Sequence, residues 1–270
     1  MYGAILGDMI GSPYEFDMGS KTKDFPLFSP ASEFTDDTVL TLAVAEAFMD
    51  AMENSTEYSD EQIKKNLVRS FKSYAARYPD AGYGARFAMW LYISNPAPYN
   101  SLGNGSAMRV SSVAWLFHTI EDVRHAARLS AEVTHNHPEG IKGAEATASA
   151  IFLARTGHSK TEIRQYIEEQ FQYDLSRTCD EIRPDYYHNE TCMMTVPEAI
   201  TAFLEGNSFE DVIRTAVSLG GDCDTLTAIA GSIAEGFYGV PNVLKKECHS
   251  RLSDDLRNTL IRFTNRLTAR

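Results

Sequence analysis

The chain has 270 residues, of which 43% are hydrophobic and 23% are charged, the composition of an ordinary soluble protein long enough for a sizeable core. A formal net charge of −12 and an isoelectric point near 5.0 argue against nonspecific binding to nucleic acid or to anionic membranes. The sequence has no apolar run long enough to cross a bilayer, and its four cysteines include no CxxC pair, which favours a reducing cytoplasm over a disulfide framework or a structural zinc site.

Apolar residues recur at helical spacing along almost the whole chain. In chain order the stripes run through residues 40–51, 63–78, 141–151, 163–171, 196–203, 209–216, 226–237 and 252–267. No run of alternating β-branched residues is long enough to predict a strand, and no Pro/Ser-rich linker or internal repeat divides the chain. The pattern predicts an all-α protein of about ten helices, folded as a compact single domain over residues 1–270.

Two segments interrupt the helical pattern and are expected to be long loops. Residues 94–109 concentrate Pro, Asn, Gly and Ser, and residues 174–195 are polar, with Pro184 and the adjacent Tyr186 and Tyr187. Long loops in compact domains are more often functional than not.

Two clusters of carboxylates each stand where a helix is expected to begin. The first is FTDDT at 34–38, before a helix predicted to start near Val39; the second is GGDCDT at 220–225, before a helix predicted to start near Leu226. Helix capping explains one such side chain per helix, because Thr and Asp are preferred there. It does not explain two aspartates and a threonine at both, since the extra carboxylates repel each other.

Carboxylate and hydroxyl oxygens in that number suit Mg²⁺ or Mn²⁺. Carboxylates from two helix starts are able to bridge two metal ions about 3.5–4 Å apart. A rival interpretation takes Asp222-Cys223-Asp224 as the DxD nucleophile of haloacid-dehalogenase-type phosphatases. That motif follows a β-strand in a parallel-sheet domain, whereas here a helical pattern and two glycines precede it.

Taken together, five segments resemble the ADP-ribosylglycohydrolase family. They are GAILGDMIGSPYEF (3–16), FTDDTVLTLAVAEAF (34–48), GNGSAMRVSSVAWLF (103–117), VTHNHPEGIKGAEATA (133–148) and SLGGDCDTLTAIAGSIAEGFYGVP (218–241). The resemblance follows the order of the family over nearly the whole chain. It implies an all-α bundle around a binuclear Mg²⁺ or Mn²⁺ centre, in agreement with the periodicity.

The resemblance also implies roles for individual residues. The metal ligands would be Thr35, Asp36, Asp37, Asp222, Asp224 and Thr225. Glu15 matches a mechanistic carboxylate beside the metals, although without the resemblance a surface glutamate is the simpler interpretation. Proton transfer would fall to Glu15 or to a ligand aspartate, here Asp37 or Asp224.

The phosphates and ribose of the substrate would lie against the loop Gly103-Asn104-Gly105-Ser106-Ala107-Met108, called the glycine loop below. Glycines let backbone N–H groups approach phosphates closely. His135 matches a histidine lining the ADP-ribose site, with helix capping as the alternative, and Gly82-Tyr83-Gly84 resembles a second backbone contact, with a plain turn as the alternative. Tyr186 and Tyr187 are the candidates for stacking on adenine. The expected substrate-binding residues are Gly82, Tyr83, Gly84, Gly103, Asn104, Gly105, Ser106, Met108 and His135.

The sequence departs from the family at Cys223, where Thr or Ser is usual, and at Thr227, where Ala is common; neither change removes a ligand. The resemblance therefore implies a hydrolase that releases single ADP-ribose units from a protein or small molecule, with arginine linkage favoured. Two alternatives stay open: action on another linkage (serine, nucleic acid or O-acetyl-ADP-ribose), and noncatalytic binding of ADP-ribose.

Overall fold

The structure is a computed structural model that describes residues 1–19, 21–54 and 59–269. Within these residues the chain forms α-helices, one 3₁₀ helix and a single isolated β-bridge, with no strand, so the predicted all-α single domain is confirmed. No helix in the described ranges is long and apolar enough to cross a membrane. The elements are α1 (Tyr2–Gly11), η1 (Ser12–Asp17), α2 (Asp36–Asn54), α3 (Asp60–Arg77), α4 (Ala85–Leu91), α5 (Gly105–Met108), α6 (Val113–Leu116), α7 (Ile120–Glu132), α8 (Pro138–Arg155), α9 (Lys160–Phe171), α10 (Cys179–Ile182), α11 (Cys192–Glu205), α12 (Phe209–Val217), α13 (Cys223–Tyr238), α14 (Asn242–Arg251) and α15 (Asp254–Thr268).

The prediction of about ten helices was too low, since the described residues form fifteen α-helices. Helices α5, α6 and α10 have four residues each, too short for an apolar stripe to repeat. Both expected loops were also too long. Residues 94–109 contain α5, and residues 174–195 contain α10 and the start of α11.

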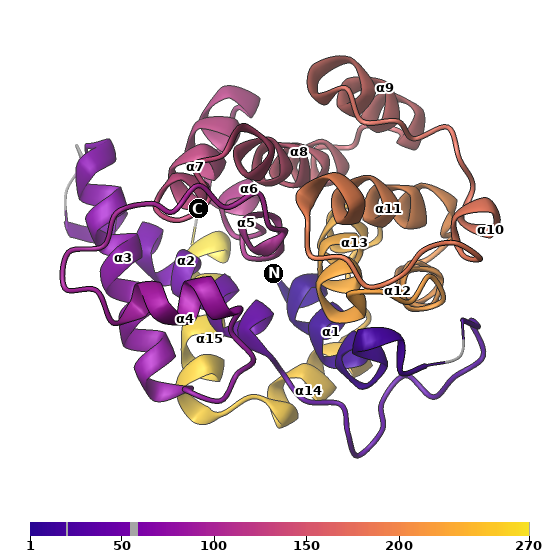
Figure 1. The fold of residues 1–270 in the computed structure, drawn as a ribbon, viewed down its shortest axis with the longest axis horizontal. Helices are drawn as coiled ribbons and strands as arrows, with labels where there is room; N and C mark the ends of the chain where they lie inside the picture. The colour runs from indigo at the N-terminus through magenta and orange to yellow at the C-terminus, as the bar shows by residue number, and fades with distance from the viewer. Residues whose placement is uncertain (20, 55–58, 270) are drawn as a thin grey trace.

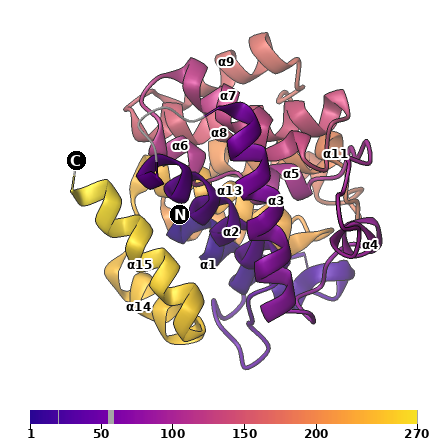
Figure 2. The ribbon, with the colours of Figure 1, turned by 90° about the vertical axis from the view of Figure 1, so that its left-hand side faces the viewer.

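Helices α1 and α13 lie side by side at the centre of the molecule, and the other helices surround them (Figures 1 and 2). Glycines on α1 permit this close packing. A Cβ atom built on Gly3 would lie 2.1 Å from the Gly231 carbonyl oxygen, and one built on Gly7 would lie 2.3 Å from the Thr227 carbonyl oxygen. The two backbones are therefore nearly in contact, which brings the C-terminal end of α1 beside the first turn of α13.

The helices that carry the aspartate clusters begin three residues earlier than predicted, at Asp36 rather than near Val39 and at Cys223 rather than near Leu226. The aspartates thus belong to the first turns of α2 and α13 or cap them, instead of preceding the helices. Behind them, the predicted apolar stripe of α2 is buried in the core. The first turn is consequently held in place by the packing of the whole helix.

The segment before α11 pairs with the segment before α5. The Asn104 amide donates to the Glu190 carbonyl oxygen at 2.8 Å, and the Cys192 amide donates to the Leu102 carbonyl oxygen at 3.0 Å. Gly103 and Thr191 form the isolated antiparallel bridge. These contacts fix the glycine loop, which is predicted to bind substrate, to the segment just before α11. The pairing is a short stretch of antiparallel, sheet-like hydrogen bonding.

Candidate active site

A cavity of about 360 Å³ collects most of the residues singled out from the sequence. The predicted residues that line it are Glu15, Asp36, Asp37, Gly82, Gly84, Gly103, Asn104, Gly105, Met108, His135, Asp222, Asp224 and Thr225. Of the predicted metal ligands and substrate-binding residues, Thr35, Tyr83 and Ser106 do not line it. Segments far apart in the sequence therefore converge on one concave site.

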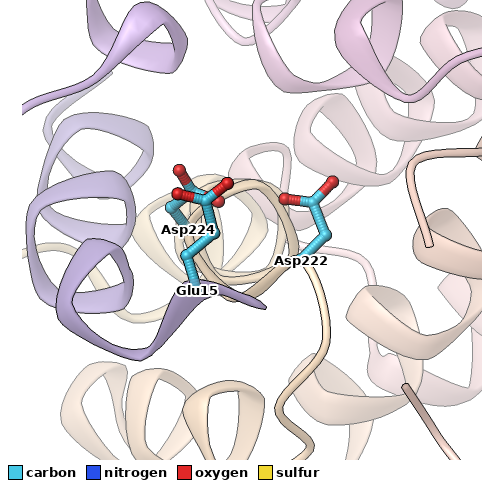
Figure 3. Close-up of side chains that lie close together, drawn as sticks. All are labelled: Glu15, Asp222 and Asp224. Atoms are coloured by element: carbon cyan, nitrogen blue, oxygen red, sulfur yellow. The ribbon is translucent and has the colours of Figure 1, made fainter. Parts of the chain in front are cut away.

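Glu15 and the two aspartates of the second cluster meet in this cavity. Glu15, Asp222 and Asp224 each offer an oxygen, and these three oxygens lie within 4.8 Å of one another. Figure 3 shows the carboxylates of Glu15 and Asp224 side by side, with Asp222 directed to the same space. The Thr225 hydroxyl donates to Asp37 Oδ2 at 3.0 Å, which joins the start of α13 to the start of α2.

The electrostatics of this cluster oppose ionisation of the carboxylates. Burial, and next to it the charge of Asp224, raises the pKa of Glu15 to about 8 and the pKa values of Asp36 and Asp37 well above the ordinary range. Among the described side chains, Asp37 Oδ1 is buried without a hydrogen-bond partner. Clustered buried oxygens with a free lone pair are the donor set that a divalent cation takes, so these residues fit a metal site.

Asp8 supports the site from outside the cavity lining, although no role for it was predicted from the sequence. Its buried carboxylate accepts hydrogen bonds from the Thr35 amide at 2.9 Å, the Thr35 hydroxyl at 2.8 Å and the Thr38 amide at 3.0 Å. Burial, and then the charge of Asp224, raises its pKa to about 7. Asp8 therefore anchors the start of α2. The sequence signal that could have identified it is a single charged residue inside the otherwise apolar α1.

Thr35 is occupied by this anchor. Its hydroxyl donates to Asp8 and lies 3.4 Å from Asp224 Oδ2, so it sits beneath the cavity floor, within reach of the carboxylates but outside the lining. The Cys223 side chain is directed to the Val217 carbonyl oxygen, 3.8 Å from its sulfur, and does not line the cavity.

Glu15 enters the cavity from a turn with uncommon backbone geometry. The residues that follow it, Phe16 and Asp17, have φ values of 55° and 56°, in the left-handed region that non-glycine residues rarely occupy. Such conformations cost about 1–3 kcal/mol each and persist where the surroundings enforce them. The Glu15 carboxylate is thus held in place by contacts of the turn rather than by a helix.

Gly103, Asn104, Gly105 and Met108 of the glycine loop line the cavity beside the carboxylate cluster. Asn104 Nδ2 donates to Asp222 Oδ2 at 2.6 Å and to Thr195 Oγ1 at 3.0 Å, which ties the loop to the carboxylate cluster. A Cβ atom on Gly105 would lie 3.2 Å from His135 Nε2, so glycine permits close approach there. Ser106 points away from the cavity and donates to the Gly140 carbonyl oxygen at 2.6 Å.

His135 lines the cavity in a neutral form. Burial, and next to it the charges of Arg109 and Arg86, lowers its pKa well below the ordinary value. Its Nδ1 is hydrogen-bonded to the Thr134 hydroxyl at 2.7 Å. The capping role considered for this segment is filled by His137, whose Nδ1 accepts from the Glu139 amide at the start of α8.

The aromatic residues at the cavity are not those expected for stacking on adenine. Tyr186 is buried, with its ring against Gly221, and neither it nor the exposed Tyr187 lines the cavity. The aromatic residues that do line it are Phe16, Phe87 and Tyr99. The guanidinium of Arg86 lies over the Tyr99 ring, 4.9 Å from its centre.

An all-helical fold with buried carboxylates hydrogen-bonded to a glycine loop is the arrangement that the resemblance in the sequence implies. The model of the ADP-ribosylglycohydrolase family matches residues 1–270, so the chain belongs to that family. The predicted resemblance and the prediction of a hydrolase acting on ADP-ribose linkages are confirmed.

Individual relatives agree with this membership. The human ADP-ribosylhydrolase ARH3 is 27% identical, over 94% of this chain and 89% of its own. The ADP-ribosylarginine hydrolase Tri1 of Pseudomonas putida is also 27% identical, over 89% of this chain and 70% of its own. A solved structure of an ADP-ribosylglycohydrolase-related protein complex superposes with a TM-score of 0.65 at 21% identity, over 97% of this chain and 95% of its own, and so shares the fold.

Proposed function

We propose that the protein hydrolyses the glycosidic bond between a single ADP-ribosyl group and its target, with arginine linkage favoured. The observation that carries the proposal is the meeting of Glu15, Asp222 and Asp224 within 4.8 Å, in a cavity that the glycine loop also lines. The relative from Pseudomonas putida, an ADP-ribosylarginine hydrolase by name, supports the arginine linkage. The net charge of −12 disfavours tracking along a polyanion and supports single units as substrate.

We propose further that Mg²⁺ or Mn²⁺ ions, two in number, belong to the carboxylate cluster of the cavity. The residues that would hold them are Thr35, Asp36, Asp37, Asp222, Asp224 and Thr225, and the free lone pair of buried Asp37 Oδ1 supports this assignment. When bound, such ions orient ribose hydroxyls and lower the pKa of water.

The protein's own residues would bind and orient the substrate around that cluster. Glu15 is not one of the predicted ligands, although its carboxylate reaches the same cluster. Its pKa is raised to about 8 in the metal-free protein, so its carboxyl group is suited to give or take the proton when the bond to C1″ of the ribose breaks. Asp37 and Asp224 are the alternative proton carriers. The backbone of Gly103 and Gly105 would face the phosphates, and Tyr99 offers a ring for the adenine.

Hydrolysis of another linkage is the second candidate, because the human relative bears the broader name ADP-ribosylhydrolase. Noncatalytic binding of ADP-ribose is a weaker one, since binding alone gives no reason for Glu15 to reach the cavity on a strained turn. We also propose a reducing cytoplasm as the compartment, since the four cysteines are buried free thiols.

A substrate panel tests the linkage. ADP-ribosyl-arginine, ADP-ribosyl-serine, ADP-ribosyl-thymidine, O-acetyl-ADP-ribose and poly(ADP-ribose) would each be incubated with Mg²⁺ and with EDTA, and the release of ADP-ribose measured. We expect the highest kcat/KM for the arginine adduct. Faster turnover of poly(ADP-ribose) would refute the preference for single units, and binding of ADP-ribose without turnover of any adduct would favour the noncatalytic alternative.

A further inference from the structure

Two segments far apart in the sequence are held by one exposed carboxylate, that of Asp17. Its Oδ1 accepts a hydrogen bond from the Gly221 amide at 2.8 Å, and its Oδ2 accepts one from the His188 amide at 3.0 Å. Asp17 lies two residues after Glu15, and Gly221 immediately precedes Asp222. The hydrogen bonds of Asp17 therefore join the chain beside Glu15 to the chain beside Asp222.

The two hydrogen bonds close a ring of contacts that includes Asp222, Asn104 and Glu190 of the cavity lining. From Gly221 the chain leads to Asp222, whose Oδ2 accepts from Asn104 Nδ2 at 2.6 Å. The Asn104 amide donates to the Glu190 carbonyl oxygen at 2.8 Å, and from Glu190 the chain returns to His188 and so to Asp17. The ring links the Glu15 turn, the first residues of α13 and the glycine loop.

The backbone on both sides of Asp17 depends on these contacts. Phe16 and Asp17 occupy the left-handed region, and Gly221 has a φ of 76°. The amide of Gly221 is the donor to Asp17, while the ring of Tyr186 packs against Gly221 on another side. The Phe16 ring lies on the His188 ring, with 4.8 Å between centres. Without the Asp17 carboxylate, the turn that carries Glu15 loses its two hydrogen bonds to the rest of the site.

We propose that Asp17 is a positioning residue, whose carboxylate holds Glu15 in register with Asp222 and with the glycine loop. The inference rests on the proposed function, since it assigns Glu15 the proton transfer. Asp17 does not line the cavity and has no contact with substrate in this assignment. Its effect on the reaction runs through the position of Glu15.

The first test is a double-mutant cycle measured as kcat for the adduct that the enzyme turns over best, with metal present. A displacement of about 1 Å at a reacting group costs up to about 10²-fold in rate, so we expect Asp17→Ala to lower kcat about tenfold or more. In the Glu15→Gln background the same change should lower kcat less than about twofold, because the residue through which Asp17 acts has already lost its function. Asp17→Asn keeps one acceptor oxygen and should fall between parent and Asp17→Ala.

The matched control is Asp24→Ala, which removes an exposed carboxylate from the same connecting segment. We expect it to leave kcat at the parent value. Melting curves establish that each variant is folded. An Asp17→Ala protein that is folded and has parental kcat contradicts the proposal, and so does an equal loss of kcat in the parent and Glu15→Gln backgrounds.

A second readout needs no turnover, so it separates failure of this inference from failure of the proposed function. Titration with Mn²⁺ alone, followed by calorimetry, compares the parent, Asp17→Ala and Asp24→Ala. The Asp17 carboxylate holds the amide of Gly221, the residue before Asp222. We therefore expect Asp17→Ala to displace Asp222 and to weaken Mn²⁺ binding at least threefold, whereas Asp24→Ala should not. If no adduct is hydrolysed, this difference alone supports the positioning role; equal Mn²⁺ affinity in all three proteins overturns it.

Discussion

Glu15 is the carboxylate whose surroundings set it apart from the other acids of the cavity. It lies in η1 with a backbone that is not helical, since its ψ is 159°, and burial together with the charge of Asp224 raises its pKa to about 8. A group with that pKa holds a proton near neutral pH and is able to release it during the reaction. The aspartates of the cluster come instead from the starts of the long helices α2 and α13.

We therefore expect Glu15→Gln to lower kcat by about 10²-fold or more, the scale for loss of a general acid–base group. The dissociation constant for ADP-ribose should change much less, because the glycine loop and the other lining residues are the same in the variant. Glu33→Gln, an exposed change nearby, serves as control. Steady-state kinetics and calorimetry measure the two effects, and an undiminished kcat would move the proton transfer to Asp37 or Asp224.

Sequence patterns identified most residues at the cavity but not how they are supported. The aspartates were recognisable because two of them with a threonine exceed what a helix cap needs. Asp8 was not, because its partners Thr35 and Thr38 lie 27 and 30 positions away and only the packing of α1 brings them together. Tyr186 was misjudged as a stacking candidate for the same reason, since its burial against Gly221 is a tertiary contact.

At the scale of elements, the contact between α1 and α13 sets the geometry of the site. A Cβ atom on Gly7 would lie 2.3 Å from the Thr227 carbonyl oxygen, a backbone atom that has little room to move. Asp8 follows Gly7 directly, and Asp224 is on the facing end of α13. Any separation of the two helices therefore moves Asp8 away from Asp224.

Gly7→Ala tests this contact. Overpacking of a core costs about 1–3 kcal/mol, and we expect at least that loss in the free energy of unfolding, measured by urea denaturation. Activity should fall as well, because the start of α2 is hydrogen-bonded to Asp8 and would be displaced with it. A variant with parental stability and activity would show that the helices separate easily and that their close contact does not hold the site.

A second prediction at this scale concerns α11 and pH. Burial raises the pKa of Glu198 to about 7, and the charge of Arg177, 2.9 Å away, offsets this in part. Because the folded-state pKa is above that of an unfolded glutamate, the unfolded chain ionises first as the pH rises. The contribution of Glu198 to stability is full below about pH 4.5 and is lost as the pH rises to about 7.

Glu198→Gln removes this dependence. The free energy of unfolding of the parent should fall relative to that of the variant between about pH 4.5 and pH 7, by a few kcal/mol at most, about 1.4 kcal/mol for each unit of pKa shift. Urea denaturation at a series of pH values gives both curves. Parallel curves for the two proteins would mean that Glu198 titrates at its ordinary pKa.

The helices themselves were the most predictable feature, because a buried stripe repeats several times along each long one. The start of helix α2 was harder to predict than its apolar face. Its apolar face was evident from residue 40 onward, but its true start at Asp36 is polar and was placed outside the helix. The four-residue helices have no repeat at all, so hydrogen bonds formed only in the fold define them.

At the scale of the whole molecule, a protein with a net charge of −12 gathers several of its acids into one buried cluster. Each of these carboxylates opposes the ionisation of its neighbours, so the metal-free protein is destabilised by the arrangement. A divalent cation would relieve that repulsion. Binding at about 100 times the dissociation constant adds about 2.7 kcal/mol to the free energy of unfolding.

The most direct measurement is the melting temperature of the parent and of Asp224→Asn, each in EDTA and in excess Mn²⁺. If the cluster is a metal centre, Mn²⁺ raises the melting temperature of the parent, and the variant loses most of that increase together with its activity. In EDTA the variant should melt no lower than the parent, because it has one repelling charge fewer. If Asp224 were only a helix cap, asparagine would replace it well. An increase with Mn²⁺ as large in Asp224→Asn as in the parent would contradict the metal centre.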